Sequence, residues 1–94
     1  MSSELETRRR RALYRAEHRG TKEMDLMLGR FVRSRFAVMG PGELDAIERL
    51  LSLPDPDLNA WILDPAPVAG SETGDLIIDL RRFLGLETTE GADR

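Results

Sequence analysis

The residue types that most often carry chemistry in proteins are scarce in this chain. Its 94 residues include one histidine, His18, and no cysteine. A zinc site needs several imidazole or thiolate ligands, and the sequence offers no second one. The serines lack the histidine and carboxylate context of a nucleophilic triad, and no glycine-rich phosphate-binding loop is present. We therefore expect no metal site, no catalytic residue and no enzymatic activity.

The stretch R-G-T-K-E-M-D, from Arg19 to Asp25, is the most distinctive charged segment. Gly20 separates two helical patterns, so Arg19 is expected in the last turn of the first helix, and Glu23 and Asp25 in the first turn of the second. A cation at a helix C-terminus and anions at an N-terminus each stabilise a helix by roughly 0.3–1 kcal/mol. The segment is therefore predicted to be an exposed helix junction.

A run of arginines, Arg8 to Arg11, precedes this junction and continues with Arg15 and Arg19. Such a cluster can bind nucleic-acid phosphates, which leaves a small nucleic-acid-associated or antitoxin-like regulator as an alternative function. A short charge run is more often a solvated helix face with little effect on folding, and the pI of about 5.1 does not favour a dedicated nucleic-acid binder. We expect no nucleic-acid partner.

Apolar residues recur at helical spacing, and glycines and prolines separate the periodic segments. The pattern predicts helices over about 7–18, 21 to 36 or 38, 41–53, 55–63 and 74–84, with a loop over 65–74. Asp55 is expected to cap the fourth helix, and Gly29 to allow close approach of another helix. No segment alternates like a strand. The fold class is all-α: a compact bundle of about five short helices in a single domain, 1–94, with an ordered core of about 7–85 and a polar tail, 86–94.

The shared apolar faces of these helices predict one hydrophobic core, formed by Leu28, Phe31, Leu44, Ile47, Leu51, Trp61, Leu80 and Phe83. No apolar run approaches the length of about 20 residues that a membrane span requires, and the N-terminus lacks the apolar centre of a signal peptide. We expect a cytoplasmic protein, without membrane insertion, that is a monomer.

Two motifs together resemble one family. R-G-T-K-E-M-D matches the R-G-x-x-E signature of the SdhE-type FAD assembly factors, and L-L-S-L-P-D-P-D-L-N-A-W-I (residues 50–62) is similar to a second pattern of that family. The resemblance covers roughly residues 10–84. It implies a helical assembly factor that binds the flavoprotein subunit of succinate dehydrogenase or fumarate reductase and promotes covalent attachment of FAD.

The same resemblance implies a partner-binding surface. The signature falls on Arg19, Gly20 and Glu23, and the adjoining Asp25, Lys22 and Arg15 complete the expected set. Arg19, Gly20 and Glu23 are then expected to be dispensable for folding and needed for binding. The factor itself would bind no cofactor tightly, because the FAD belongs to the partner flavoprotein.

Overall fold

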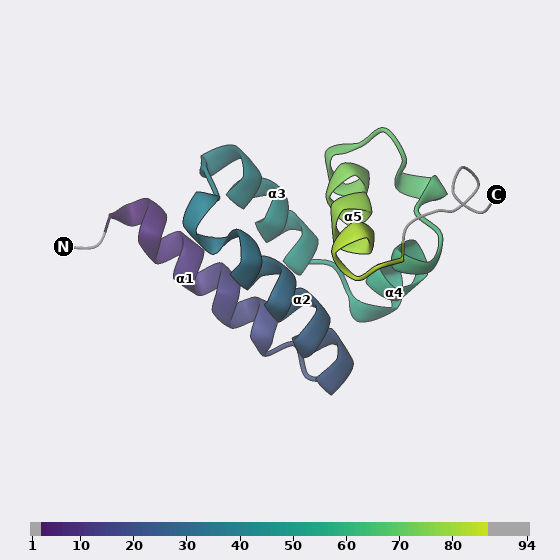
Figure 1. Ribbon diagram of the computed structural model, residues 1–94, viewed down its shortest axis with the longest axis horizontal. Coiled ribbons are helices and arrows are strands. Elements are labelled where there is room, and N and C mark those ends of the chain that lie inside the picture. Colours follow the sequence, from purple (N-terminus) through teal and green to yellow (C-terminus); the bar gives the residue numbers. More distant parts are fainter. Residues whose placement is uncertain (1–2, 87–94) are drawn as a thin grey trace.

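The computed structural model describes residues 3–86, and this range contains helices and no strand. The helices are α1 (Glu4–Glu17), α2 (Lys22–Arg35), α3 (Pro41–Leu51), α4 (Asp55–Leu63) and α5 (Glu72–Phe83), with short 3-10 turns at Phe36–Val38 and Ala66–Val68 (Figure 1). The prediction of an all-α fold with five helices is confirmed. The expected polar tail lies outside the described residues, apart from the exposed Leu86.

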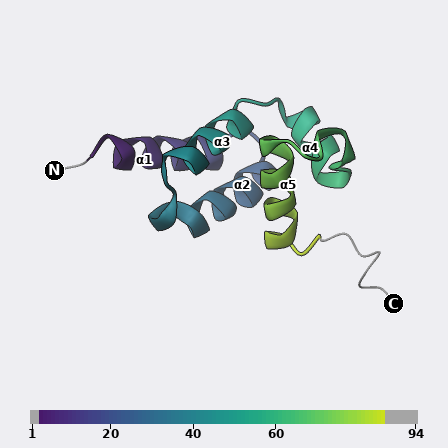
Figure 2. The ribbon, with the colours of Figure 1, turned by 90° about the horizontal axis from the view of Figure 1, so that it is seen from above.

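Helices α1 and α2 form an antiparallel hairpin, joined by residues 18–21 (Figure 1). Helix α3 packs against α1, and α5 packs against α3, α4 and α2. Seen from above, α1 and α3 lie in one layer and α2 in another, while α4 and α5 occupy the far end of the molecule (Figure 2). The turn between α3 and α4 therefore connects the hairpin end of the molecule to the α4–α5 end.

Serine side chains cap the N-termini of two helices, α1 and α5. Ser3 accepts a hydrogen bond from the Glu6 N–H at 2.9 Å, and Ser71 accepts one from the Gly74 N–H at 2.9 Å. Such caps satisfy N–H groups that have no partner within the helix. Because of them, α1 begins at Glu4 and α5 at Glu72, and the predicted starts near residues 7 and 74 are wrong.

One apolar cluster runs through the described helices and includes most of the predicted core. Its fully buried large side chains are Phe31, Met24, Leu28, Met39, Leu44, Ile47, Leu50, Leu58, Ile77, Leu80 and Val32.

Two of the predicted core residues are wrongly placed. Trp61 is only half-buried, because Leu58 and Ile62 take the inner stripe of the short helix α4. Phe83 is 43% exposed, because it is the last residue of helix α5. Its ring still contacts Phe31 edge to face, with 5.7 Å between ring centroids.

Small residues allow α1 and α2 to approach closely. Ala12 and Ala16 are the buried residues of α1, and Gly29 faces that helix from α2. A Cβ atom on Gly29 would lie 2.8 Å from Glu17 Cγ. The expectation that Gly29 serves close helix packing is confirmed.

A glycine in α5, Gly74, gives a test of how the 66–71 segment packs on that helix. A Cβ atom on Gly74 would lie 1.9 Å from the backbone oxygen of Val68, whereas one on Gly42 of α3 would meet nothing within 4 Å. We expect Gly74→Ala to lower the free energy of unfolding by about 1–3 kcal/mol, as overpacking does. Gly42→Ala, the control, should be neutral or slightly stabilising. Equal urea-unfolding midpoints for the two variants would contradict the placement of the 66–71 segment over α5.

Candidate functional site

The guanidinium of Arg19 lies inside the molecule, although the sequence predicted an exposed position. Its side chain is 9% exposed. Nη1 donates to the Leu51 oxygen at 2.6 Å, and Nη2 donates to the Leu53 oxygen at 2.6 Å and to Asp55 Oδ1 at 2.6 Å. Nε donates to the same carboxylate oxygen at 3.0 Å. Arg19 therefore ties the α1–α2 junction to the α3–α4 turn.

The surroundings of this guanidinium explain why a cation is stable there. The last carbonyls of a helix have no partner within it and carry partial negative charge. Leu51 ends α3, and Asp55 begins α4. The prediction that Asp55 caps α4 by its side chain is wrong, because Pro54 occupies the cap position and no side-chain cap hydrogen bond forms. The Asp55 carboxylate pairs with Arg19 instead.

Asp25 holds the backbone of the junction. Its Oδ1 accepts hydrogen bonds from the Arg19 N–H at 2.6 Å and from the Gly20 N–H at 3.3 Å. Gly20 has a φ of +116°, a backbone conformation that residues with a side chain rarely adopt, and a Cβ atom added there would meet nothing within 4 Å. The chain can thus reverse between α1 and α2 and place the first turn of α2 at a defined position.

Two of the predicted site residues remain available for a partner. Lys22 and Glu23 are exposed in the first turn of α2, and neither side chain makes a hydrogen bond or ion pair with any residue in the range 3–86. Arg15 is also exposed and reaches Ser52 Oγ at 3.4 Å. The structure therefore divides the expected set: Arg19 and Asp25 point inward, Gly20 shapes the turn, and Lys22, Glu23 and Arg15 face outward.

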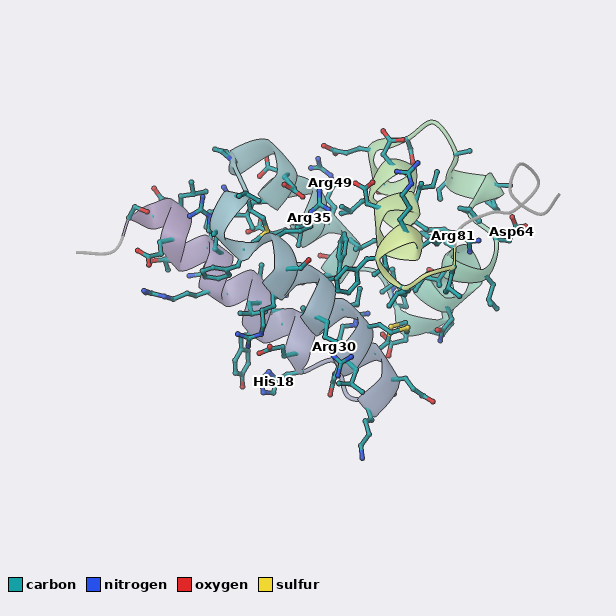
Figure 3. The ribbon with its side chains drawn as sticks, viewed as in Figure 1. His18, Arg30, Arg35, Arg49, Asp64 and Arg81 are labelled. Atoms are coloured by element: carbon teal, nitrogen blue, oxygen red, sulfur yellow. The ribbon has the colours of Figure 1, made fainter. Side chains whose placement is uncertain are left out.

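An aromatic pair beside the junction was not among the predicted site residues. Tyr14 is 63% exposed, and its ring stacks on that of His18 with 4.0 Å between centroids. The His18 ring Nδ1 lies 2.8 Å from the Tyr14 carbonyl oxygen, and Figure 3 shows His18 at the surface near the end of α1. With Arg15, Arg19 and Leu51, the pair lines a shallow pocket of about 280 Å³. Tyr14 and His18 are four residues apart, and this helical spacing is the feature of the sequence that indicates that the two rings can meet.

The arginine run is not simply a solvated face. Arg8 donates to Glu48 at 2.8 Å and to Asp45 at 2.7 Å, both on α3. Arg9 donates twice to the Met39 carbonyl oxygen, at 2.9 Å and 2.6 Å. The hydrogen bonds to Glu48 and Asp45 raise the pKa of the Arg8 guanidinium above its ordinary value. Arg8 thus joins α1 to α3, and Arg9 joins it to the Met39 carbonyl just before α3, so the expectation of a purely solvated face is wrong for these two residues. The expected small effect of the run on stability stays a prediction.

Two other kinds of site are absent from the described part of the chain. Within residues 3–86, no group of three or more histidine, aspartate or glutamate side chains is arranged to hold a metal ion. No helix in this range is both long enough and apolar enough to cross a membrane. The junction offers an ammonium, a carboxylate, a guanidinium and an aromatic pair on a fixed backbone, which suits non-covalent binding.

Comparison with known proteins agrees with the motif. A family model described as flavinator of succinate dehydrogenase, Sdh5, matches residues 10–84. The FAD assembly factor SdhE of Acetobacter pasteurianus is 42% identical over 64 residues, covering 68% of this chain and 59% of that protein. The mitochondrial succinate dehydrogenase assembly factor 2 of Dictyostelium discoideum is 39% identical over 66 residues, covering 70% and 47% respectively.

A more distant relative matches over nearly its whole length. The FAD assembly factor SdhE of Acinetobacter baylyi is 30% identical over 84 residues, which are 89% of this chain and 98% of that protein. By contrast, the matches span about half of the Acetobacter and Dictyostelium proteins. No solved structure matches the chain.

The inward position of Arg19 makes folding depend on it. We expect Arg19→Ala to lower the free energy of unfolding by about 2–3 kcal/mol, because the Asp55 carboxylate and two carbonyls lose their donor. Arg19→Lys should recover part of this loss, since an ammonium keeps the charge but lacks the planar fork. Arg30→Ala on the exposed face of α2 is the control, expected within about 0.5 kcal/mol of wild type. A normal melt for Arg19→Ala would contradict the assignment.

The conformation of Gly20 gives a second test at the same junction. Gly20→Ala meets no neighbouring atom, so its cost comes from the positive φ alone. We expect a loss of about 1–2 kcal/mol in chemical denaturation. Gly42→Ala, which has neither a positive φ nor a close neighbour, is again the control. A Gly20→Ala variant as stable as this control would show that the turn adopts another conformation.

Proposed function

Because the chain belongs to the family of succinate dehydrogenase flavinators, we propose that it binds the flavoprotein subunit of succinate dehydrogenase and promotes covalent attachment of FAD. The observation that carries the proposal is the family match over residues 10–84. This range contains the whole junction and the α3–α4 turn that anchors it. The flavoprotein of fumarate reductase is a second partner of the same class.

The contact surface that we propose is the outward side of the junction. Glu23 presents carboxylate oxygens to a basic or amide group of the partner, and Lys22 presents an ammonium beside it. Both stand on the first turn of a helix whose start is fixed by Asp25 and Gly20. A charged group held in place loses little conformational entropy on binding, so more of the contact energy appears as affinity. Arg19 acts as a positioning residue in this scheme.

The proposed mechanism is positioning of the partner. The described residues offer no glycine-rich phosphate cradle and no cluster that would hold a metal, so the FAD is assigned to the flavoprotein. The covalent bond then forms between the flavin and a residue of that partner. The factor would hold the flavoprotein in the geometry that favours this bond, and alignment of reacting groups alone can lower a barrier by several kcal/mol. One copy of the chain with one flavoprotein suffices for this role.

Substitution of Glu23 tests function separately from folding. Glu23 is exposed, and its side chain makes no hydrogen bond or ion pair in the range 3–86, so Glu23→Ala should melt within about 0.5–1 kcal/mol of wild type, losing only a helix-dipole contribution. We expect the rate of covalent FAD attachment to the purified flavoprotein to fall about tenfold or more, because a charged interface contact is removed. Flavin fluorescence of the denatured flavoprotein in a gel measures the product.

The matched control is Glu4→Ala. Glu4 is likewise an exposed carboxylate in the first turn of a helix, α1, at the opposite end of that helix from the junction. It should retain full flavin attachment with a similarly small change in melting. Full activity of Glu23→Ala would remove the junction from the binding surface, and a lack of any effect of the wild-type chain on FAD attachment would overturn the proposed function.

A further inference from the structure

The outer side of α2 beyond the junction carries a ridge of exposed side chains. Lys22, Leu26 and Arg30 are four residues apart, so they lie in one row along the helix. Leu26 is 49% exposed between the two cations. Neither the Lys22 nor the Arg30 side chain makes an ion pair or hydrogen bond with any residue that the structure describes between 3 and 86. Figure 3 shows Arg30 on α2, away from Arg49 of α3 and Arg81 of α5.

A hollow lies on each side of this row. The first has a volume of about 440 Å³ and lies between α2, which contributes Gly29 to its wall, and α1, which contributes Glu17. The second has a volume of about 300 Å³ and lies between α2 and the end of α5. Met27 of α2 forms one wall, and Phe83 and Leu84 form the other. Leu26 and Arg30 line both hollows. The row is therefore a ridge flanked by two grooves.

Two of the carboxylates beside the ridge are already engaged. Glu17 pairs with Arg33 at 2.5 Å, and Asp25 accepts the backbone N–H groups of the junction. On the row itself, the charges left for a partner are those of Lys22 and Arg30, and the Glu23 carboxylate beside Lys22 stays available for the basic or amide group proposed above. A binding partner must therefore bring negative charge to the two ends of the ridge and apolar groups to its middle, where Leu26 and the half-exposed Phe83 lie.

We propose that this ridge, Lys22–Leu26–Arg30 with Phe83, is a docking surface for an acidic amphipathic helix of the partner flavoprotein. The inference rests on the proposed function and extends the contact surface along α2 to α5. Rows of side chains four residues apart, with grooves on both sides, are the shape into which the corresponding rows of another helix fit. The two cations are about 12 Å apart along the axis, eight residues at 1.5 Å each. A partner helix with carboxylates about two turns apart and a leucine-rich face between them would match both charges and both grooves.

The test measures binding of the chain to the purified flavoprotein subunit by calorimetry, with thermal melts alongside. Leu26→Asp and Arg30→Glu are each expected to weaken binding about tenfold or more, because each places a like charge against the acidic helix. Leu63→Asp and Arg11→Glu are the matched controls. Leu63 is 79% exposed on α4, and Arg11 is exposed on α1. Both controls should change the dissociation constant by less than about twofold, since neither residue lies at the ridge.

The salt dependence of binding is a second measurement, and a purely structural role of Arg30 would not change it. Arg30→Glu should flatten the dependence of affinity on salt, while Arg30→Lys should keep both affinity and salt dependence close to wild type. Hydrogen exchange of the flavoprotein should show protection of a helix that carries carboxylates, and this protection should be lost with Leu26→Asp.

Several outcomes would overturn the proposal. Wild-type affinity of Leu26→Asp and Arg30→Glu, with binding still lost in Glu23→Ala, would confine the interface to the junction and leave the proposed function standing. Protection of a strand or an uncharged loop instead of an acidic helix would also contradict it. A homodimer in sedimentation that Leu26→Asp dissolves would assign the ridge to a second copy of this chain. Failure of the wild-type chain to bind the flavoprotein would overturn both proposals.

Discussion

The guanidinium of Arg19 connects two parts of the chain that are far apart in the sequence. Arg19 follows α1, and its acceptors lie in and beside the turn between α3 and α4. Three acceptor groups converge on a planar donor, a geometry that arginine satisfies and lysine does not. The helix end at Leu51 and the carboxylate of Asp55 both favour a positive charge at this position. The orientation of the α1–α2 hairpin relative to α4 and α5, and with it the position of the exposed first turn of α2, depends on this interaction.

Helix α1 illustrates how charged residues can compensate for a small apolar surface. It buries only Ala12 and Ala16 completely, and two alanines contribute little hydrophobic stabilisation compared with leucine or phenylalanine. Their small size instead permits close contact with Gly29 of α2. Arg8 and Arg9 then attach the first half of the helix to α3 and to the Met39 carbonyl. Individual exposed ion pairs stabilise weakly, yet directional contacts of this kind still fix how the helix is rotated.

The R-G-x-x-E motif combines structural and binding roles in one short segment. The glycine reverses the chain, so the arginine before it points into the molecule and the glutamate after it points out. Asp25 closes the turn from the other side. Substitution of Arg19 or Asp25 is therefore expected to change stability and binding together. Substitution of Lys22 or Glu23 is expected to change binding alone. The ridge along α2 begins at Lys22, so the junction and the ridge form one continuous exposed face.

The sequence by itself determined the helices, most of the core and the family. Apolar residues at helical spacing and the Gly-Pro punctuation are local features, and they placed the five helices to within a few residues; Gly29 was also correctly assigned to close packing. The serine caps that begin α1 and α5 earlier than the apolar spacing predicts are local features as well. Only the tertiary structure decided where Arg19, Asp55, Arg8, Trp61 and Phe83 point. Their neighbours come from segments far away along the chain: Arg19 meets acceptors 32 to 36 positions later. A charged side chain turns inward only where folding assembles enough acceptors to replace its water, and no local pattern around Arg19 records that assembly.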